Sequence, residues 1–174
     1  MPNYRRARVP GASYFFTVVT YRRRRILTTP AAIRALRESI AVVRQHMAFS
    51  IDAWVVLPDH MHAMWTLPAA DHDYSRRWGH IKAEFVRRSG LPHRSRSGAG
   101  ACIWQPRFWE HVIRDERDWQ AHMDYLHYNP VKHGWVERVA DWRHSSFHRC
   151  VQRGWHEADW GSTEPSGPDS DCGE

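Results

Sequence analysis

The run from Trp54 to Trp65 constrains this chain most, because it places two histidines in the alternating pattern of a β-strand. It reads Trp-Val-Val-Leu-Pro-Asp-His-Met-His-Ala-Met-Trp. Successive strand side chains point to opposite faces, so we expect His60 and His62 on one face, with Cβ atoms roughly 6–7 Å apart, and Met61 in the core. Two imidazoles on one rigid face can hold a divalent metal. The alternative is that two of the 13 histidines fell at this spacing by chance and line a wet surface.

Apolar periodicity along the rest of the chain predicts a ferredoxin-like fold, an α+β sandwich with helices on one face of a small antiparallel sheet. The predicted strands are residues 13–21, 51–57, 60–67 and 108–114, and the predicted helices are residues 30–47, 75–89 and 115–128. Thr29 and Ser75 are the expected N-caps of the first two helices. Pro130 is expected to stop the third helix near Tyr128 or Asn129.

The length of 174 residues suits a single domain. We expect residues 1–160 to form it, with a basic N-terminal arm and a C-terminal extension, and residues 161–174 to be an acidic, disordered tail. Residues 93–101 are predicted to be a loop. The three cysteines show no paired spacing, which argues against a disulfide framework. No stretch approaches the roughly 20 apolar residues of a membrane span, so we expect a soluble, cytoplasmic protein without a membrane partner.

Basic residues dominate the chain before this tail. All 25 lysines and arginines precede residue 154, whereas six of the 19 acidic residues follow residue 156. Such an imbalance is typical of proteins that bind a polyanion, and nucleic acid is the obvious candidate. The basic residues that are plausible DNA contacts, although each could equally be a solvated charge, are Arg5, Arg6, Arg8, Arg22, Arg23, Arg24, Arg25, Arg76, Arg77, Lys82, Arg107 and Lys132.

A metal site in a polyanion-binding domain suggests phosphoryl transfer, which needs a nucleophile. The chain lacks a glycine-rich phosphate loop and a dense carboxylate cluster. A tyrosine can serve, because a covalent phosphotyrosine conserves the energy of a phosphodiester. Among six tyrosines, Tyr125 is followed four residues later by Asn129, whose amide could complete a metal shell on the same helical face. Alternatively, Tyr125 is an amphipathic-helix residue with its ring in the core and its hydroxyl at the rim.

Three separated motifs closely resemble the REP-associated tyrosine transposases, which are single-tyrosine HUH transposases. The motifs are Trp54–His62, Trp104-Gln-Pro-Arg-Phe-Trp-Glu-His111 and Asp124-Tyr-Leu-His-Tyr-Asn-Pro-Val-Lys-His-Gly134. They occur in the family's order, and the likeness runs from about Tyr4 to Trp160. The resemblance implies a ferredoxin-like fold with the histidine pair on the central sheet and the tyrosine on a neighbouring helix.

The same resemblance implies roles for individual residues. His60 and His62 would ligate a divalent metal, Mg²⁺ or Mn²⁺, and Asn129 would stand at the third-ligand position, where related insertion-sequence enzymes carry glutamine. Tyr125 would attack single-stranded DNA and leave a 5′-phosphotyrosine and a free 3′-hydroxyl. The expected substrates are repetitive extragenic palindromes (REP), which are hairpins with a short tetranucleotide near the foot. The family also implies a monomer that acts at the bacterial nucleoid.

Two other functions fit parts of the sequence. A non-catalytic nucleic-acid binder could stack bases on the aromatic strand between Tyr14 and Tyr21, as an RRM-like sheet does. A zinc hydrolase could use the same histidines, but zinc catalysis normally takes three protein ligands with an acid or base nearby.

Overall fold

A computed structural model describes residues 6–92 and 102–161 of the chain. Four antiparallel strands form its sheet in the order β2-β3-β1-β4. The strand order and the intervening helices confirm the ferredoxin-like prediction. Arg5, the loop predicted at 93–101 and residues 162–174 of the predicted tail lie outside the described residues. The strands are β1 (Ser13–Val19), β2 (Ser50–Val56), β3 (His60–Thr66) and β4 (Trp109–Val112).

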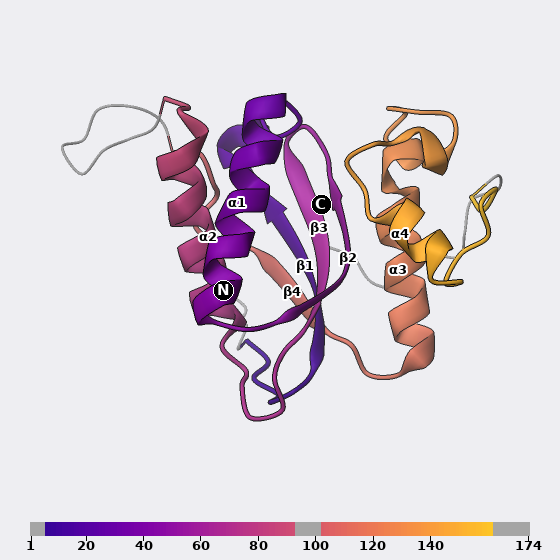
Figure 1. The fold of residues 1–174 in the computed structure, drawn as a ribbon, viewed down its shortest axis with the longest axis horizontal. Helices are drawn as coiled ribbons and strands as arrows, with labels where there is room; N and C mark the ends of the chain where they lie inside the picture. Colours follow the sequence, from indigo (N-terminus) through magenta and orange to yellow (C-terminus); the bar gives the residue numbers. More distant parts are fainter. Residues whose placement is uncertain (1–5, 93–101, 162–174) are drawn as a thin grey trace, which may run out of the picture.

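Helices α1 (Pro30–His46) and α2 (Tyr74–Ser89) lie side by side on one face of the sheet (Figure 1). The Thr29 hydroxyl caps α1 by accepting from the backbone N–H of Ala32, as predicted. The predicted cap of α2 at Ser75 is wrong. Asp73 caps this helix by accepting from the N–H of Arg76, and its carboxylate also suits the positive end of a helix.

Helices α3 (Glu116–Lys132) and α4 (Phe147–Gln152) cover the opposite face of the sheet (Figure 1). The prediction of helices on one face only is therefore wrong. The reason is a second apolar cluster, in which Phe15, Val55 and Met64 of the sheet pack against Met123 and Leu126 of α3. Two short 3₁₀ helices, η1 (Tyr21–Arg23) and η2 (Val139–Asp141), complete the regular elements of the described residues. None of the described helices is long and apolar enough to cross a membrane.

The aromatic strand β1 is buried on both of its faces. Tyr14, Phe15 and Phe16 have no exposed surface, because Tyr14 and Phe16 point towards α1 and α2 while Phe15 points towards α3. Bases cannot stack on rings that helices already cover. The RRM-like alternative, in which this strand forms an open nucleic-acid platform, is therefore contradicted.

Helix α3 runs through Pro130 and ends at Lys132, so the predicted stop near Asn129 is also wrong. Pro130 removes one backbone donor, but its ring is buried and the helix gains only two further residues. The true end is a Schellman motif: the N–H of Trp135 donates to the Pro130 carbonyl and that of Gly134 to the Val131 carbonyl. Gly134 adopts the left-handed conformation that this motif needs, with φ of 68°.

Candidate active site

The histidine pair lies at the start of β3, on the sheet face that α3 covers. Both side chains are buried, and their ring centroids are 5.0 Å apart with planes nearly perpendicular. Met61, between them, packs into the core on the opposite face. The strand alternation predicted from the sequence therefore places both imidazoles on one rigid face.

A hydrogen bond at Nδ1 orients each imidazole. The Nδ1 atom of His60 lies 2.7 Å from Oδ1 of Asp59, and that of His62 lies 2.9 Å from Oγ1 of Thr17. A proton on Nδ1, donated to these oxygens, leaves the lone pair of each ring on Nε2. Nε2 of His60 is buried and has no hydrogen-bond partner among the described residues. A buried nitrogen with an available lone pair fits a metal ligand, and the Nδ1 contacts are those that orient metal-binding histidines.

Asp59 is itself held in its ionised form. Arg23 donates to its second carboxylate oxygen at 3.2 Å. Burial raises the pKa of Asp59, but the hydrogen bond from His60 and the nearby Arg23 outweigh burial and lower the pKa to about 2. The carboxylate is therefore charged at neutral pH and remains a strong acceptor for His60.

Tyr125 lies on α3 beside the histidine pair. Its ring centroid is 5.4 Å from that of His62 and 6.0 Å from that of Phe15, and its side chain is half-buried. Asn129 follows one turn later and is completely buried. The structure thus brings the tyrosine against the histidine pair across more than sixty residues of chain, with Asn129 one turn further along the same helix.

Two further residues at the end of α3 lie near the site: Lys132, its last residue, and His133, its C-cap. Nζ of Lys132 lies 3.5 Å from the Tyr125 hydroxyl and 4.8 Å from the centroid of its ring. The His133 ring lies 5.4 Å from that of His60. Sequence reasoning gave Lys132 only a role in DNA contact and did not single out His133. A helix that ends near Tyr128 or Asn129 leaves both residues outside it. Because the helix continues, His133 follows Tyr125 and Asn129 on one helical face at four-residue spacing.

A second cluster of possible metal ligands joins β4 to the start of α3. It consists of His111, Asp118 and His122, whose ligand atoms all lie within 4.8 Å of one another. The two rings stack at 4.6 Å with only 18° between their planes. Nε2 of His111 bonds the carboxylate at 2.8 Å, whereas Nδ1 of His122 bonds the backbone carbonyl of Asp118 at 2.8 Å. His111 and Arg114 already bond the carboxylate, so the cluster forms a hydrogen-bonded clamp between β4 and the start of α3. Burial raises the pKa of Asp118, but hydrogen bonds from His111 and Arg114 outweigh it and hold that pKa low.

The predicted DNA contacts have very different surroundings. Arg77 is buried, with 1% of its side chain exposed, and donates to Asp71 at 2.6 Å and to the Ala48 carbonyl at 2.7 Å, so it cannot reach a ligand. Lys82 is half-buried and donates to the Gln105 carbonyl, and burial lowers its pKa to about 8. Arg6 and Arg24 are also half-buried. The exposed members of the set are Arg8, Arg22, Arg23, Arg25, Arg76, Arg107 and Lys132.

Comparison with known protein families gives a match over most of the chain. Residues 8–129 match the model of a family described as "Transposase IS200 like". This span contains both strands of the histidine hairpin, Tyr125 and Asn129.

Individual relatives are similar over nearly their whole length. The chain is 48% identical to the REP-associated tyrosine transposase of Escherichia coli K12, over 92% of this chain and 91% of that protein. It is 42% identical to a putative REP-associated tyrosine transposase of Haemophilus influenzae, over 92% of this chain and 94% of the relative. A solved structure of a REP-associated tyrosine transposase bound to a REP hairpin superposes with a TM-score of 0.86. The two sequences are 46% identical, and the match covers 100% of this chain and 98% of the chain in that structure.

Proposed function

From the premise that this chain belongs to the IS200-like transposase family, we propose that it cleaves and rejoins single-stranded DNA at REP-type hairpins through Tyr125. Family membership makes it a tyrosine transposase, an enzyme that nicks and joins DNA. The observation that carries the residue assignment is the position of the Tyr125 ring, 5.4 Å from His62 and beside the buried His60.

In the proposed reaction, the Tyr125 hydroxyl oxygen attacks a DNA phosphorus atom. A bond forms between that oxygen and the phosphorus, and the bond from the phosphorus to the 3′ oxygen breaks. The phenol loses its proton and the departing 3′ oxygen gains one, so the products are a 5′-phosphotyrosine and a free 3′-hydroxyl. Attack by a 3′-hydroxyl on the phosphotyrosine reverses these changes and rejoins a strand.

Lys132 is placed to assist the nucleophile. Only about a thousandth of an ordinary phenol is ionised at neutral pH, so the attacking form must be stabilised. The ammonium group, 3.5 Å from the hydroxyl, supplies a positive charge that favours the phenolate. Phe15 and His62 fix the ring from the sheet side, which limits the directions from which the oxygen can approach phosphorus.

His60, His62 and Asn129 would hold a divalent metal, which we propose is Mg²⁺ or Mn²⁺. Such an ion polarises a phosphate and stabilises charge in the transition state. Asp59 and Thr17 hold the Nδ1 atoms of the two histidines, so their Nε2 atoms would be the ones that ligate the ion. Asn129 contributes a neutral oxygen donor, which suits these hard cations.

The proposed partner is a single-stranded REP-type hairpin, and a DNA substrate of this kind places the activity in the cytoplasm, at the nucleoid. A REP hairpin is the ligand in the structure of the similar transposase. Because Tyr125 and both histidines come from one chain, one copy carries all the residues of the proposed site. This supports activity as a monomer.

A hairpin cleavage assay tests the proposal. A labelled single-stranded REP-type oligonucleotide incubated with Mg²⁺ or Mn²⁺ should give a shortened strand and a protein–DNA adduct that survives denaturation. His60→Ala/His62→Ala should lose cleavage and keep most of the hairpin binding. The matched control is Tyr128→Phe, which removes a phenol three residues from Tyr125 and should cleave like wild type. Metal-dependent cleavage by the double histidine variant would show that the metal site is wrongly assigned.

A further inference from the structure

An exposed tryptophan lies at the edge of the site. In the described part of the chain, Trp135 and Trp155 are the tryptophans with more than a third of their surface exposed, at 39% and 37%. Trp135 follows the Schellman turn at the end of α3, two residues beyond His133, whose ring contacts that of His60. The guanidinium carbon of Arg25 lies 5.2 Å from the Trp135 ring centroid. An exposed indole with a guanidinium beside it offers a nucleic acid a stacking surface and a positive charge at the same place.

A basic hollow lies between α1 and the segment that precedes α4. Its volume is about 480 Å³, and it is lined by residues that include Arg34, Arg37, Arg143 and His144. Among the described residues, none of these three arginines has an ion-pair partner, although Glu38 also lines the hollow. Burial, followed by the nearby charges of Arg143 and Arg37, lowers the pKa of His144, as expected where cations gather.

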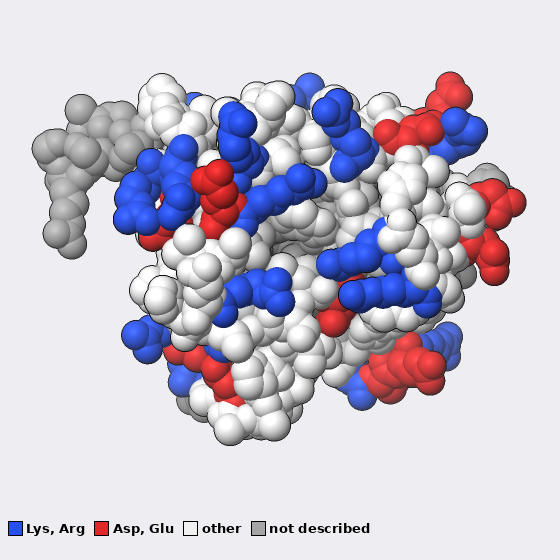
Figure 2. Space-filling model, in the orientation of Figure 1, with Lys and Arg blue, Asp and Glu red and all other residues white. Residues whose placement is uncertain are grey.

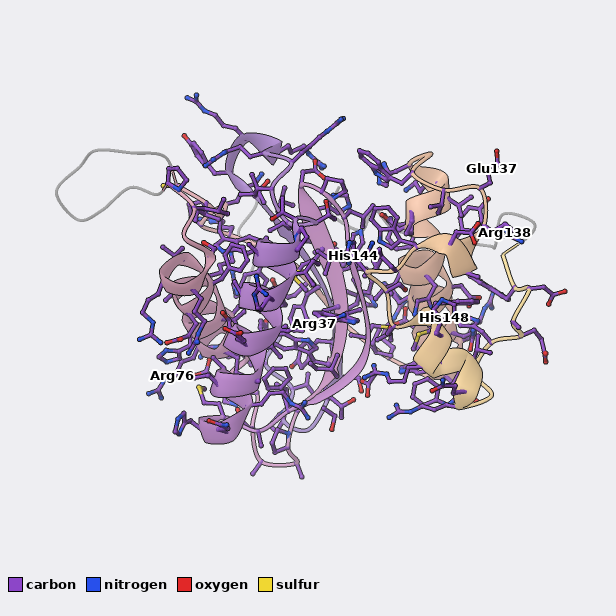
Figure 3. The ribbon with its side chains drawn as sticks, turned by 45° about the horizontal axis from the view of Figure 1, so that its top comes forward. Arg37, Arg76, Glu137, Arg138, His144 and His148 are labelled. Atoms are coloured by element: carbon purple, nitrogen blue, oxygen red, sulfur yellow. The ribbon has the colours of Figure 1, made fainter. Side chains whose placement is uncertain are left out.

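The figures show how these charges are arranged. In Figure 2, lysine and arginine side chains surround a hollow in the middle of the face shown. In Figure 3, Arg37 on α1 and His144 lie close together, whereas Arg138 projects at the far edge of the molecule. Arg138 is also neutralised by an ion pair with Asp141 at 3.0 Å. The hollow thus gathers three arginines that pair with no carboxylate in the described part of the chain.

Trp142 lies between the exposed Trp135 and the residues that line the hollow. Its ring centroid is 6.4 Å from that of Trp135, and its indole N–H donates to the carbonyl of Val56 on β2. The next two residues, Arg143 and His144, line the hollow. The backbone of His144 also accepts from the N–H of Val56, which fixes this segment along the sheet edge. A chain of neighbouring residues thus leads from the exposed His133, beside the site, over Trp135 and Trp142 to the three arginines.

We propose that this surface is a track for the single-stranded DNA that flanks the hairpin. One base would stack on Trp135 beside Arg25, and the sugar-phosphate backbone would continue into the hollow towards Arg34, Arg37 and Arg143. Aromatic rings that stack bases, next to a positive groove that follows the phosphates, are what sequence-tolerant single-strand binding requires. The inference rests on the proposed function for its substrate, but it assigns binding residues outside the nicking site.

Binding of single strands tests the track separately from cleavage. The probe is an unstructured oligothymidine of about ten nucleotides, a length typical of single-strand sites. Its affinity for the full chain is measured by fluorescence anisotropy over a range of salt concentrations. Trp135→Ala should weaken binding about fivefold to a hundredfold, and Trp135→Phe should recover most of that loss. Arg37→Gln/Arg143→Gln should reduce the slope of log affinity against log salt by about 1.4, or about 0.7 per lost phosphate contact.

Two control variants separate the track from general effects of aromatic area and charge. Trp155→Ala removes a tryptophan of similar exposure that also has an arginine beside it, Arg153 at 5.0 Å. Trp155 contacts Trp119, at the opposite end of α3 from Trp135. Arg138→Gln removes an exposed charge away from the hollow. Both controls should bind oligothymidine like wild type, and thermal unfolding checks that every variant is folded.

The outcomes distinguish failure of the track from failure of the proposed function. Unchanged oligothymidine binding after Trp135→Ala, or equal loss in Trp155→Ala, would overturn the track even if hairpins are cleaved. Failure of wild type to bind oligothymidine would also overturn it. Loss of binding in the track variants, with controls unchanged, would support the track even if no hairpin were cleaved; the failed cleavage would then count against the proposed function alone.

Discussion

Single hydrogen bonds set the chemistry of the site at the residue scale. Asp59 precedes the histidine pair in sequence, and Thr17 faces it from the neighbouring strand, yet each holds the Nδ1 atom of one imidazole. The Asp59 contact is visible in the motif itself. The Thr17 contact depends on strand pairing between β1 and β3, which local sequence does not specify. Candidate metal ligands are therefore easier to predict from sequence than the residues that orient those ligands.

Asp59→Asn tests the orienting role of this carboxylate. Asparagine keeps an acceptor oxygen but loses the charge that pairs with Arg23 and His60. Loss of such a partner typically costs 10- to 100-fold in metal affinity or activity. The metal concentration that gives half-maximal hairpin cleavage should rise about 10- to 100-fold. Asp141→Asn, which also removes an arginine-paired carboxylate, is the control. A metal requirement unchanged in Asp59→Asn would contradict the role.

Two adjacent arginines on α2 should contribute very differently to the stability of the fold. Arg77 is buried and bonds the partly exposed Asp71, whereas Arg76 is exposed. Arg77→Ala should lower the free energy of unfolding by about 1–3 kcal/mol, because it removes a buried guanidinium that donates to Asp71 and to two backbone carbonyls. Arg76→Ala should change it by less than about 0.5 kcal/mol. Urea unfolding measures both. Equal stability of the two variants would show that Arg77 is a surface residue after all.

At the scale of elements, α3 builds the site. The spacing of Tyr125 and Asn129 predicted a shared helical face, and the structure agrees. The end of the helix could not be placed from Pro130, because a proline near a C-terminus removes only one hydrogen bond and its ring can be buried. The stronger signal was Gly134, which terminates the helix and turns Trp135 towards the surface.

Two glycine substitutions test this account of the helix end, with opposite signs. Gly134→Ala should destabilise the fold by about 1–2 kcal/mol, because alanine disfavours φ of 68°. Gly79→Ala, inside α2, should stabilise it by up to about 1 kcal/mol, because alanine favours the helix. Nothing lies within 4 Å of the added methyl group at either position, so clashes do not mask the backbone effect. A stabilising Gly134→Ala, measured by urea unfolding, would contradict the Schellman end.

At the scale of the whole molecule, the sequence predicted the four strands and their ferredoxin-like order. It did not predict that α3 and α4 would cover the second face. The apolar residues of that face belong to segments as distant as Phe15 and Cys150, and only the folded sheet brings them together. This second layer matters for function, because it places Tyr125 against the histidines and closes the sheet to base stacking.

Buried histidines in this second layer should make the fold sensitive to acid. Burial lowers the pKa of His156 to about 4. Between about pH 6.5 and 4 the unfolded chain therefore binds more protons than the folded one, and the free energy of unfolding falls as pH falls, by up to about 1.4 kcal/mol per pH unit. His156→Gln should make this dependence shallower in urea unfolding at pH 7, 6 and 5. Exposed His148→Gln is the control, and identical slopes in both variants would contradict the role of His156.

The proposed reaction depends on Tyr125 as the nucleophile, and the covalent adduct identifies the attacking residue directly. Wild type is reacted with a REP-type hairpin and Mg²⁺ or Mn²⁺ and then digested with trypsin and nuclease. The peptide Asp118–Lys132 contains both Tyr125 and Tyr128, so fragmentation by mass spectrometry can assign the attached nucleotide to one of them. We expect a 5′-phosphonucleotide on Tyr125. A nucleotide on Tyr128 or on any other residue, or cleavage without a covalent adduct, would contradict it.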